Sequence, residues 1–462
     1  MPKSPAPRRA AVALRERARA AVTSRRPGGE DERRAPRPPR RLAGVYRYLA
    51  IVGPGLIVAN AGNDAGGIFT YTNTGSKYGV GLLWTFIPVL VALIVTQEMV
   101  ARLGTVTGKG LMDLIREHFG VRWTLFVSAV VLVANGGTVL AEFIGVAGAM
   151  GLLGVRKEVA VPLAALLITL VVLRANRKLV ERVFLVLGLA FVSYIITAIT
   201  VHPDWGAVAR ALIPHLDHQD VNPAQTPYTT DVITLIGTTI TPYMQLFLQS
   251  SIVDKGTSEK ELRFARADVI TGSVFAQMVA GFIVITAATT LFAHGCVGGT
   301  CFPGNDLSST SDAALALQPL AGEHAKQLFA VGLLGASLLA AAVLPLSTAF
   351  VICEAFGAER SVQRSFREAP LFFTLFLGIV VIGAGAVLII AEASLTKVAI
   401  ATQTLDGILL PVLLIFILVL ANNRRLLGRH RNRLLNNVVA GGLTLVLTAL
   451  TGYLVVSTVL PS

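Results

Sequence analysis

Long apolar runs separated by short polar segments recur along most of the chain. A helix that spans a bilayer needs roughly 20 mostly apolar residues. Runs of this kind begin near eleven positions: Leu49, Leu82, Trp123, Val159, Val180, Val232, Val269, Leu328, Leu371, Val398 and Val438. The pattern predicts an all-α integral membrane protein of about 11 transmembrane helices over residues 46–462.

Composition agrees with this prediction. The 462 residues are 53% hydrophobic and only 15% charged, with a mean hydropathy of +0.67, whereas average soluble domains carry about 25% charged residues. A soluble domain cannot bury this much apolar surface, because single cores stop growing near ~250–300 residues.

The net charge of +13 is concentrated before the first apolar run. Residues 1–41 hold 13 Lys or Arg and 4 acidic residues, a net charge of +9. A segment so rich in Pro, Arg and Ala has too little apolar surface to fold. We expect residues 1–45 to be a disordered cytoplasmic tail that binds anionic lipid headgroups rather than nucleic acid.

The charges between the runs predict the orientation. With the tail inside the cell, alternate loops should be basic. Lys and Arg do gather after the second, fourth, sixth, eighth and tenth runs, and Arg156 with Lys157 is a short exception. We therefore expect a multi-pass protein of the plasma (inner) membrane with the C-terminus outside. Cys296 and Cys301 then fall in an outer loop, where a disulfide is favoured, and Cys353 inside an apolar run is expected to be buried.

The first and sixth runs are the least regular. The first, VGPGLIVANAGNDAGGIFTY, combines Gly and Pro with Asp64, although a carboxylate at the bilayer centre costs at least ~2.5–3.5 kcal/mol. The sixth, DVITLIGTTITPYMQLFLQSS, places Thr, Gly and Pro242 at mid-membrane. Interrupted helices one and six are typical of LeuT-like transporters built from two five-helix inverted repeats, where the unwound backbone binds the ion or substrate. Each interruption alone is also compatible with an ordinary kink.

Five segments resemble the NRAMP divalent-metal transporters. They are GPGLIVANAGNDAGG in the first run, residues 83–111 in the second, TVLAEFIG in the third, GTTITPYMQLFLQSS in the sixth and TQTLDGILLP in the tenth. In this resemblance Asp64 matches the metal-binding aspartate, Gln403 matches a glutamine near the site, and Glu142 is a retained acid of the third helix. The resemblance implies no cofactor, with the divalent metal ion as the substrate.

The departures from the family pattern point to one branch. Ala65 replaces the proline of the first motif, and Thr241 replaces a methionine that supplies a thioether ligand. Tyr243 and Gln249 stand where the two histidines of the sixth helix fall, and Val139 replaces an acid. This pattern is most similar to the NRAMP-related magnesium transporters, which implies transport of Mg²⁺ and Mn²⁺ without tight proton coupling.

The residue chemistry favours the same ions. Thioether and imidazole ligands suit transition metals, whereas hard ions such as Mg²⁺ prefer oxygen. The predicted metal ligands are Asp64, Asn63, Thr241, Gln403, Asp406 and Glu142. For Glu142 a helix-locking hydrogen bond is the alternative role. Met244 would reach the site only if its helix unwinds.

The seven histidines all fall in predicted loops or helix ends. Because intramembrane histidines are common proton relays, we expect uncoupled uptake. Nearer the inner end, Glu98 is expected either to pair with Arg102 or to line a path, and Glu354 either to line a path or to extend toward the lipid headgroups.

Two rival functions of the same fold stay open at this stage: a proton-coupled Mn²⁺/Fe²⁺ symporter, and an amino-acid or amine transporter. An enzyme is not expected, because no catalytic motif is present. The sequence does not predict an oligomeric state.

Overall fold

The computed structural model describes residues 63–174, 192–214, 228–297, 300–318, 324–358 and 366–459. The predicted basic tail, the fifth apolar run up to residue 191 and the first run before Asn63 lie outside these ranges, and α10 covers the end of the fifth run. Apart from a two-stranded hairpin, the regular elements in these ranges are helices, which agrees with the predicted fold class.

The first half of the chain forms helices only. They are α4 (Ala65–Tyr78), η1 (Leu83–Thr85), α5 (Phe86–Thr107), α6 (Leu111–Phe119), α7 (Val121–Leu152), α8 (Lys157–Arg174), α10 (Val192–Thr200), α11 (Trp205–Ala211), α12 (Tyr228–Thr239) and α13 (Pro242–Asp254).

The second half adds the hairpin. Its elements are η3 (Glu259–Glu261), α14 (Leu262–Ala287), the π-helical η4 (Ala288–Phe292), β1 (Cys296–Val297), β2 (Thr300–Cys301), α15 (Thr310–Leu315), α17 (Ala325–Phe356), α18 (Pro370–Ile389), η6 (Glu392–Ser394), α19 (Leu395–Asn422), α20 (Arg424–Leu427), η7 (Gly428–His430) and α21 (Leu434–Val459).

Seven helical segments of the described ranges are long and apolar enough to cross a membrane. They correspond to the second, third and seventh to eleventh predicted spans. The sixth span is divided into α12 and α13, and the fourth corresponds to α8. The total of eleven therefore stays a prediction.

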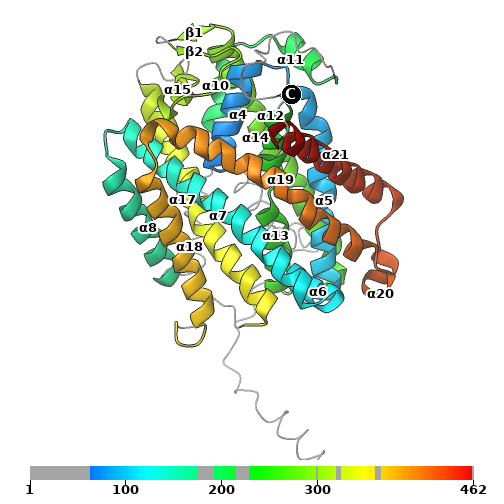
Figure 1. The fold of residues 1–462 in the computed structure, drawn as a ribbon. Helices are drawn as coiled ribbons and strands as arrows, with labels where there is room; N and C mark the ends of the chain where they lie inside the picture. Colours follow the sequence, from blue (N-terminus) through cyan, green and yellow to red (C-terminus); the bar gives the residue numbers. More distant parts are fainter. Residues whose placement is uncertain are drawn as a thin grey trace, which may run out of the picture. The chain divides into compact units, whose positions relative to one another are not determined.

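The connecting segments gather at two opposite ends of the bundle. Figure 1 places β1, β2, α11 and α15 at one end, and α6 and α20 at the other. The hairpin end carries the disulfide between Cys296 and Cys301, as predicted, and Cys353 is buried and forms no disulfide. The two ends thus match the alternating loops of the sequence analysis.

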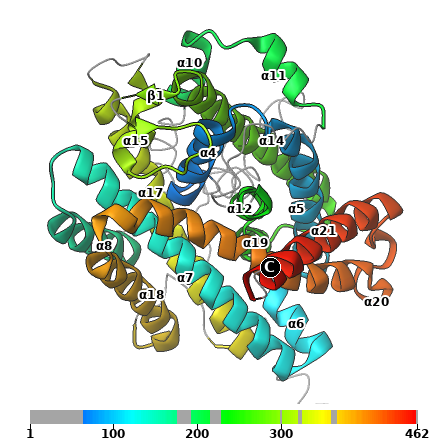
Figure 2. The ribbon, with the colours of Figure 1, turned by 45° about the horizontal axis from the view of Figure 1, so that its top comes forward.

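Small residues allow the central helices to pack backbone to backbone. A Cβ atom built on Gly237 of α12 would lie 2.2 Å from the carbonyl oxygen of Gln403 in α19, and one on Gly407 would lie 2.5 Å from the carbonyl oxygen of Ile233. Figure 2 shows α12 against α19 near the middle of the bundle. Glycine is needed here because membrane helices approach closely only where side chains are small.

The end that carries α6 is closed by a buried acid. Glu354 at the end of α17 accepts hydrogen bonds from the backbone N–H of Asp113 (3.2 Å) and from Oγ of Ser250 (3.3 Å). Only 2% of it is exposed, so extension toward the headgroups is wrong. Glu98, by contrast, pairs with Arg102 (3.2 Å), one of its two expected roles, and also with Arg266 (2.7 Å).

The close contact at Gly237 generates a prediction. Gly237→Ala should lower the unfolding free energy by about 1–3 kcal/mol, because the new methyl group overlaps fixed backbone atoms of α19. Gly378→Ala in α18 is the matched control, because nothing lies within 4 Å of its added Cβ. Thermal unfolding in detergent compares the two variants. Equal melting temperatures would contradict the packing argument.

Candidate functional site

Asp64 forms the N-cap of α4. Its Oδ1 accepts a hydrogen bond from the backbone N–H of Gly67 (2.7 Å), and the residue is 1% exposed. A carboxylate is stabilised here by the positive end of the helix dipole. Within the described ranges its Oδ2 has no hydrogen-bond partner, so one oxygen is left for another ligand.

Glu142 of α7 holds the same helix start. Its Oε2 accepts from the backbone N–H of Ala65 (3.3 Å), while its Oε1 has no hydrogen-bond partner among the described residues. Gly145, one turn along α7, permits the approach, since a Cβ there would lie 2.4 Å from Cβ of Ala65. Glu142 therefore has the helix-locking role that the sequence analysis weighed, and keeps one free oxygen.

Helix α19 places Gln403 against α4 and Asp406 against α7. A Cβ on Gly66 would lie 2.0 Å from Nε2 of Gln403, which puts this side chain against the first turn of α4. Oδ2 of Asp406 accepts from Oγ1 of Thr138 (2.8 Å), one helical turn before Glu142 on α7. Both residues are fully buried, and Oε1 of Gln403 and Oδ1 of Asp406 lack a hydrogen-bond partner in the described part of the chain.

Asp64 lies within electrostatic reach of both other carboxyl groups. Asp64 acts on both Glu142 and Asp406, and all three act on Tyr243 in the first turn of α13. The ion pairs found among the described residues give none of the three acids a Lys, Arg or His partner. A buried negative charge without a basic partner must either bind a proton or meet a cation.

The sixth span is interrupted where the sequence predicts. Helix α12 ends at Thr239 and α13 begins at Pro242, with Thr241 in an extended conformation between them (φ −73°, ψ 148°). Proline is preorganised for a helix start and cannot continue the ladder of α12. Thr241 is fully buried but does not cap α13 with its side chain, so its hydroxyl is not used to complete that helix.

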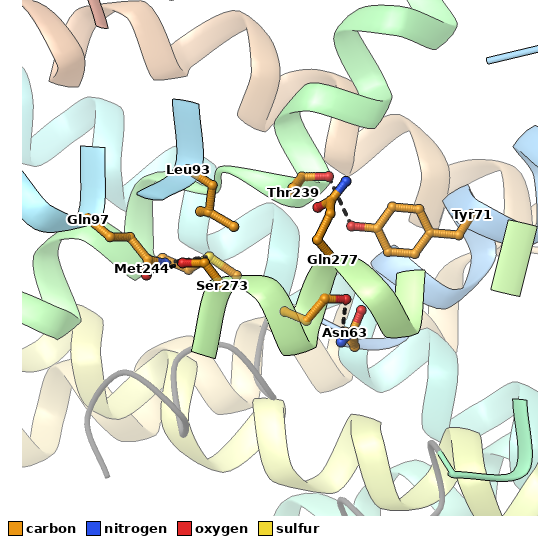
Figure 3. Close-up of a pocket in the computed structure, with 9 residues that line it drawn as sticks. Asn63, Tyr71, Leu93, Gln97, Thr239, Met244, Ser273 and Gln277 are labelled. Carbon is orange, nitrogen blue, oxygen red and sulfur yellow. Dashed lines mark hydrogen bonds between the residues drawn. The ribbon is translucent and has the colours of Figure 1, made fainter. Parts of the chain in front are cut away.

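A small pocket adjoins this region. It is lined by Asn63, Tyr71, Leu93, Gln97, Thr239, Met244, Ser273, Ala276 and Gln277 (Figure 3). Nδ2 of Asn63 donates to the carbonyl oxygen of Ala276 (3.4 Å), and the hydroxyl groups of Tyr71 and Thr239 are hydrogen-bonded (3.0 Å). Most of the lining side chains carry a neutral polar group, and the space among them is about that of a single water molecule.

Of the six predicted ligands, Asp64, Glu142 and Gln403 meet at the start of α4, and Asp406 is bound to Thr138 of α7, one turn before Glu142. Asn63 faces the adjoining pocket, and Thr241 lies at the break of the sixth span. No group of three or more His, Cys, Asp or Glu side chains in the described ranges is arranged to hold a metal ion. Any ion bound here would therefore combine carboxylates with amide, hydroxyl or water oxygens.

Several polar residues near the site were missed in the sequence analysis. Gln245 is fully buried, and neither its oxygen nor its nitrogen has a hydrogen-bond partner among the described residues. The sequence feature that could have identified Gln245 is its position, four residues after Thr241 in an otherwise apolar run. Ser273 and Gln277 show the same spacing on α14, and both line the pocket.

Met244 reaches the pocket without any unwinding of α13. No unwinding is needed for this contact, because α13 is regular from Pro242 onward and Met244 lines the pocket. Nε2 of Gln97 lies 3.9 Å from the sulfur of Met244, and Oε1 of Gln97 accepts a hydrogen bond from Oγ of Ser273 (3.2 Å). A thioether is thus present beside the oxygen-rich site.

Comparisons with known proteins assign a family. The family model "Nramp: Natural resistance-associated macrophage protein-like" matches residues 55–457. The chain is 28% identical over 432 residues to the divalent metal cation transporter MntH of Burkholderia ambifaria, covering 90% of both chains. It is 29% identical over 425 residues to MntH of Yersinia pestis, covering 88% of this chain and 95% of the relative.

Solved structures confirm the fold class. A mutant of the Eremococcus coleocola manganese transporter superposes with a TM-score of 0.74 at 23% identity, over 92% of this chain and 90% of that one. MhsT in complex with L-phenylalanine superposes with a TM-score of 0.54 at 15% identity, over 87% and 98% of the two chains. The all-helical transporter fold that the interrupted spans predicted is therefore present.

The double role of Glu142 can be tested. Glu142→Gln keeps an oxygen acceptor for the N–H of Ala65, whereas Glu142→Leu leaves that buried donor unpaired, a loss of about 1–3 kcal/mol. We expect a lower melting temperature in detergent for the Leu variant only. Equal stability of the two variants would show that Glu142 does not hold the start of α4.

Proposed function

The chain belongs to the Nramp family, and from that premise we propose that it carries divalent metal cations across a membrane, with Mg²⁺ and Mn²⁺ as substrates. One observation carries this proposal: Asp64, Glu142 and Asp406 are buried together without a basic partner among the described residues, and each keeps a free carboxylate oxygen. The relatives named as divalent metal cation transporters and manganese transporters support the same class of substrate.

The donor set favours hard ions. Asp64, Gln403, Asp406 and the Thr241 hydroxyl offer oxygen, which suits Mg²⁺, and Mg²⁺ keeps several waters because its dehydration is costly. The neutral polar side chains of the adjoining pocket supply partners for such waters. Met244 supplies a thioether in that pocket, which supports Mn²⁺ as a second substrate because softer ligands favour transition metals.

The placement of histidine supports uptake without proton coupling. Within the described ranges, His118 lies in α6, and the others lie in loops or at helix ends: His202, His294, His324 and His430. His215 and His218 lie outside the described residues. With a negative cell interior a divalent ion gains about 4.6 kcal/mol per 100 mV, twice the ~2.3 kcal/mol of a single charge, so that no second gradient is required.

A proton-coupled Mn²⁺/Fe²⁺ symporter is the second candidate function. The free oxygens of Glu142 and Asp406 favour it, because a buried carboxyl group can bind a proton when the metal leaves. An amino-acid transporter of the same fold is less well supported, since the carboxylate of Asp64 would repel the substrate carboxylate.

Orientation belongs to the same proposal. We place the protein in the plasma membrane with the basic residues 1–45 in the cytoplasm at anionic lipid headgroups, as the charge of the loops predicts. The end of the bundle with the hairpin and its disulfide would then face outward.

Ion flux into proteoliposomes tests the function. We expect uptake of Mg²⁺ and Mn²⁺ with a constant internal pH, and we expect Asp64→Ala to abolish both fluxes because the site loses its capping carboxylate. Glu392→Gln is the matched control, since Glu392 is exposed in η6 and should leave the flux unchanged. Uptake of Mn²⁺ alone with acidification of the lumen would instead establish the proton-coupled symporter.

The ion preference can be tested at Thr241. Thr241→Met adds a soft ligand at the break of the sixth span, so we expect Mn²⁺ to compete against Mg²⁺ about tenfold better, ~1.4 kcal/mol of differential binding. Competition in the same flux assay measures the change, with Thr241→Leu as the control for size. A preference that is equal in the Met and Leu variants would exclude Thr241 from the ion site.

A further inference from the structure

The opposite end of α4 carries a triad of charges in which Lys77 and Asp231 are buried and the side chain of Asp306 is 30% exposed. Nζ of Lys77 lies 2.8 Å from Oδ2 of Asp231 and 2.8 Å from Oδ1 of Asp306, and the lysine side chain is fully buried. The hydroxyl group of Tyr78 also donates to Asp231. One cation thus joins two carboxylates, and none of these residues belongs to the ion site described above.

The triad joins three separate segments of the chain. Lys77 ends α4 in the first span, Asp231 lies in the first turn of α12 in the sixth span, and Asp306 follows the disulfide hairpin. Backbone contacts hold the third segment against the first. Oδ1 of Asn73 accepts from the N–H of Leu307 (2.7 Å), and the carbonyl oxygen of Lys77 accepts from the N–H of Gly304 (3.0 Å).

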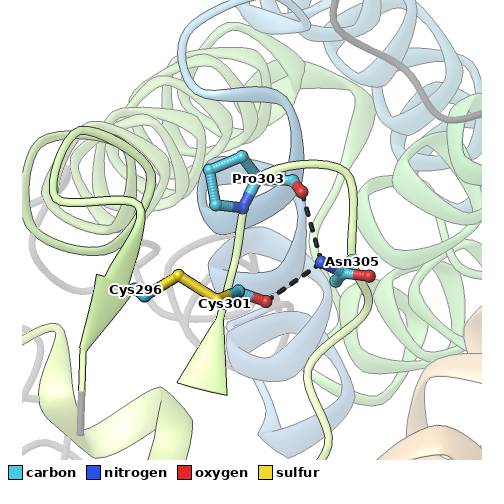
Figure 4. Close-up of a disulfide and its surroundings, with 4 residues drawn as sticks. All are labelled: Cys296, Cys301, Pro303 and Asn305. Atoms are coloured by element: carbon cyan, nitrogen blue, oxygen red, sulfur yellow. Dashed lines mark hydrogen bonds between the residues drawn. A yellow bond between two sulfur atoms is a disulfide. The ribbon is translucent and has the colours of Figure 1, made fainter. Parts of the chain in front are cut away.

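The loop that supplies Asp306 is itself tied to the hairpin. The disulfide joins Cys296 to Cys301, and Nδ2 of Asn305 donates to the carbonyl oxygens of Cys301 (3.1 Å) and Pro303 (3.3 Å), as Figure 4 shows. The carboxylate of Asp306 is therefore presented by a short, internally bonded loop. A loop of this kind can hold its charge in place with little loss of entropy.

The triad and the ion site lie at opposite ends of the same two helices. Helix α4 runs from Asp64 to the triad, about 20 Å at 1.5 Å per residue, and α12 runs from Asp231 to the break near Thr241. An ion that enters between these helices from the hairpin end would pass the triad. The triad binds them to each other and to the loop at the point where they would have to separate.

We propose that Lys77, Asp231 and Asp306 form a lock that keeps the hairpin end of the bundle closed and opens to admit the ion from that side. The inference rests on the transport function proposed above. A dry ion pair is costly to break because it leaves an uncompensated buried charge, whereas a hydrated pair contributes little. Entry of water therefore weakens the ion pairs of the lock, and exclusion of water strengthens them again. Partly opened arrangements are disfavoured as a result, so the lock is either closed or open.

Thiol accessibility tests the lock directly. Ser273→Cys places a thiol in the pocket of the site, and a membrane-impermeant methanethiosulfonate reagent is added outside intact cells. With Lys77→Met in the same chain we expect labelling at least about tenfold faster, because losing the buried cation shifts the equilibrium toward the open state. An unchanged labelling rate would overturn the proposal.

Three controls separate the lock from other causes. Lys157→Met removes another buried lysine, which donates to the carbonyl oxygens of Val387 (3.2 Å) and Ile390 (2.5 Å), and should not change the labelling rate. Buried Cys353 reports unfolding, because its labelling in Lys77→Met without Ser273→Cys would mean that the chain has lost its fold. If Lys77→Met unfolds, Asp306→Asn is used instead, and we expect it to label faster than the parent chain to a similar degree.

Ion flux measured in the same variants distinguishes the two proposals. If Lys77→Met is labelled faster but the protein with Lys77 intact transports neither Mg²⁺ nor Mn²⁺, the lock is supported and the transport function is refuted. Flux of both ions with labelling that does not depend on Lys77 would support transport and refute the lock.

Discussion

The structure depends on a single electrostatic constraint: negative charge is buried in an apolar bundle with no basic side chain beside it in the described residues. Asp64 and Glu142 meet where α4 begins, and Asp406 is bound to α7 one turn before Glu142; each uses one oxygen in a hydrogen bond, and the other has no partner among the described residues. Such an arrangement costs free energy in the absence of a cation. The local fold compensates part of that cost through the helix start that Asp64 caps and through the N–H of Ala65 that Glu142 binds.

The same constraint explains why the helices are interrupted rather than merely polar. An intact helix uses its own backbone groups, whereas a helix start leaves N–H groups free to stabilise a carboxylate. Glycine then becomes necessary for a second reason, since Gly66, Gly145, Gly237 and Gly407 let neighbouring helices approach the interrupted segments. Charge burial, broken helices and close packing are thus consequences of one requirement.

Much of this was predictable from the sequence. The apolar runs predicted the helical class, and the Gly and Pro in the sixth run predicted its interruption. Asp64 was identified as a site residue because no packing role explains a carboxylate there. Gln245 and the pocket residues Gln97, Ser273 and Gln277 were not found, because a single amide or hydroxyl in an apolar run gives a weak signal. The contacts of Lys77 were not predictable either, since pairing across more than 150 residues depends on tertiary packing.

The ion pairs of Lys77 also set an order for the assembly of the protein. Asp231 follows Lys77 by 154 residues and Asp306 follows it by 229, so at 5–20 residues per second the second partner emerges from the ribosome about 10 to 50 s after the lysine. Asp231 becomes available about two thirds of the way through that interval, and Asp306 only at its end. The complete set of contacts around Lys77 can therefore form only after the hairpin segment has been synthesised.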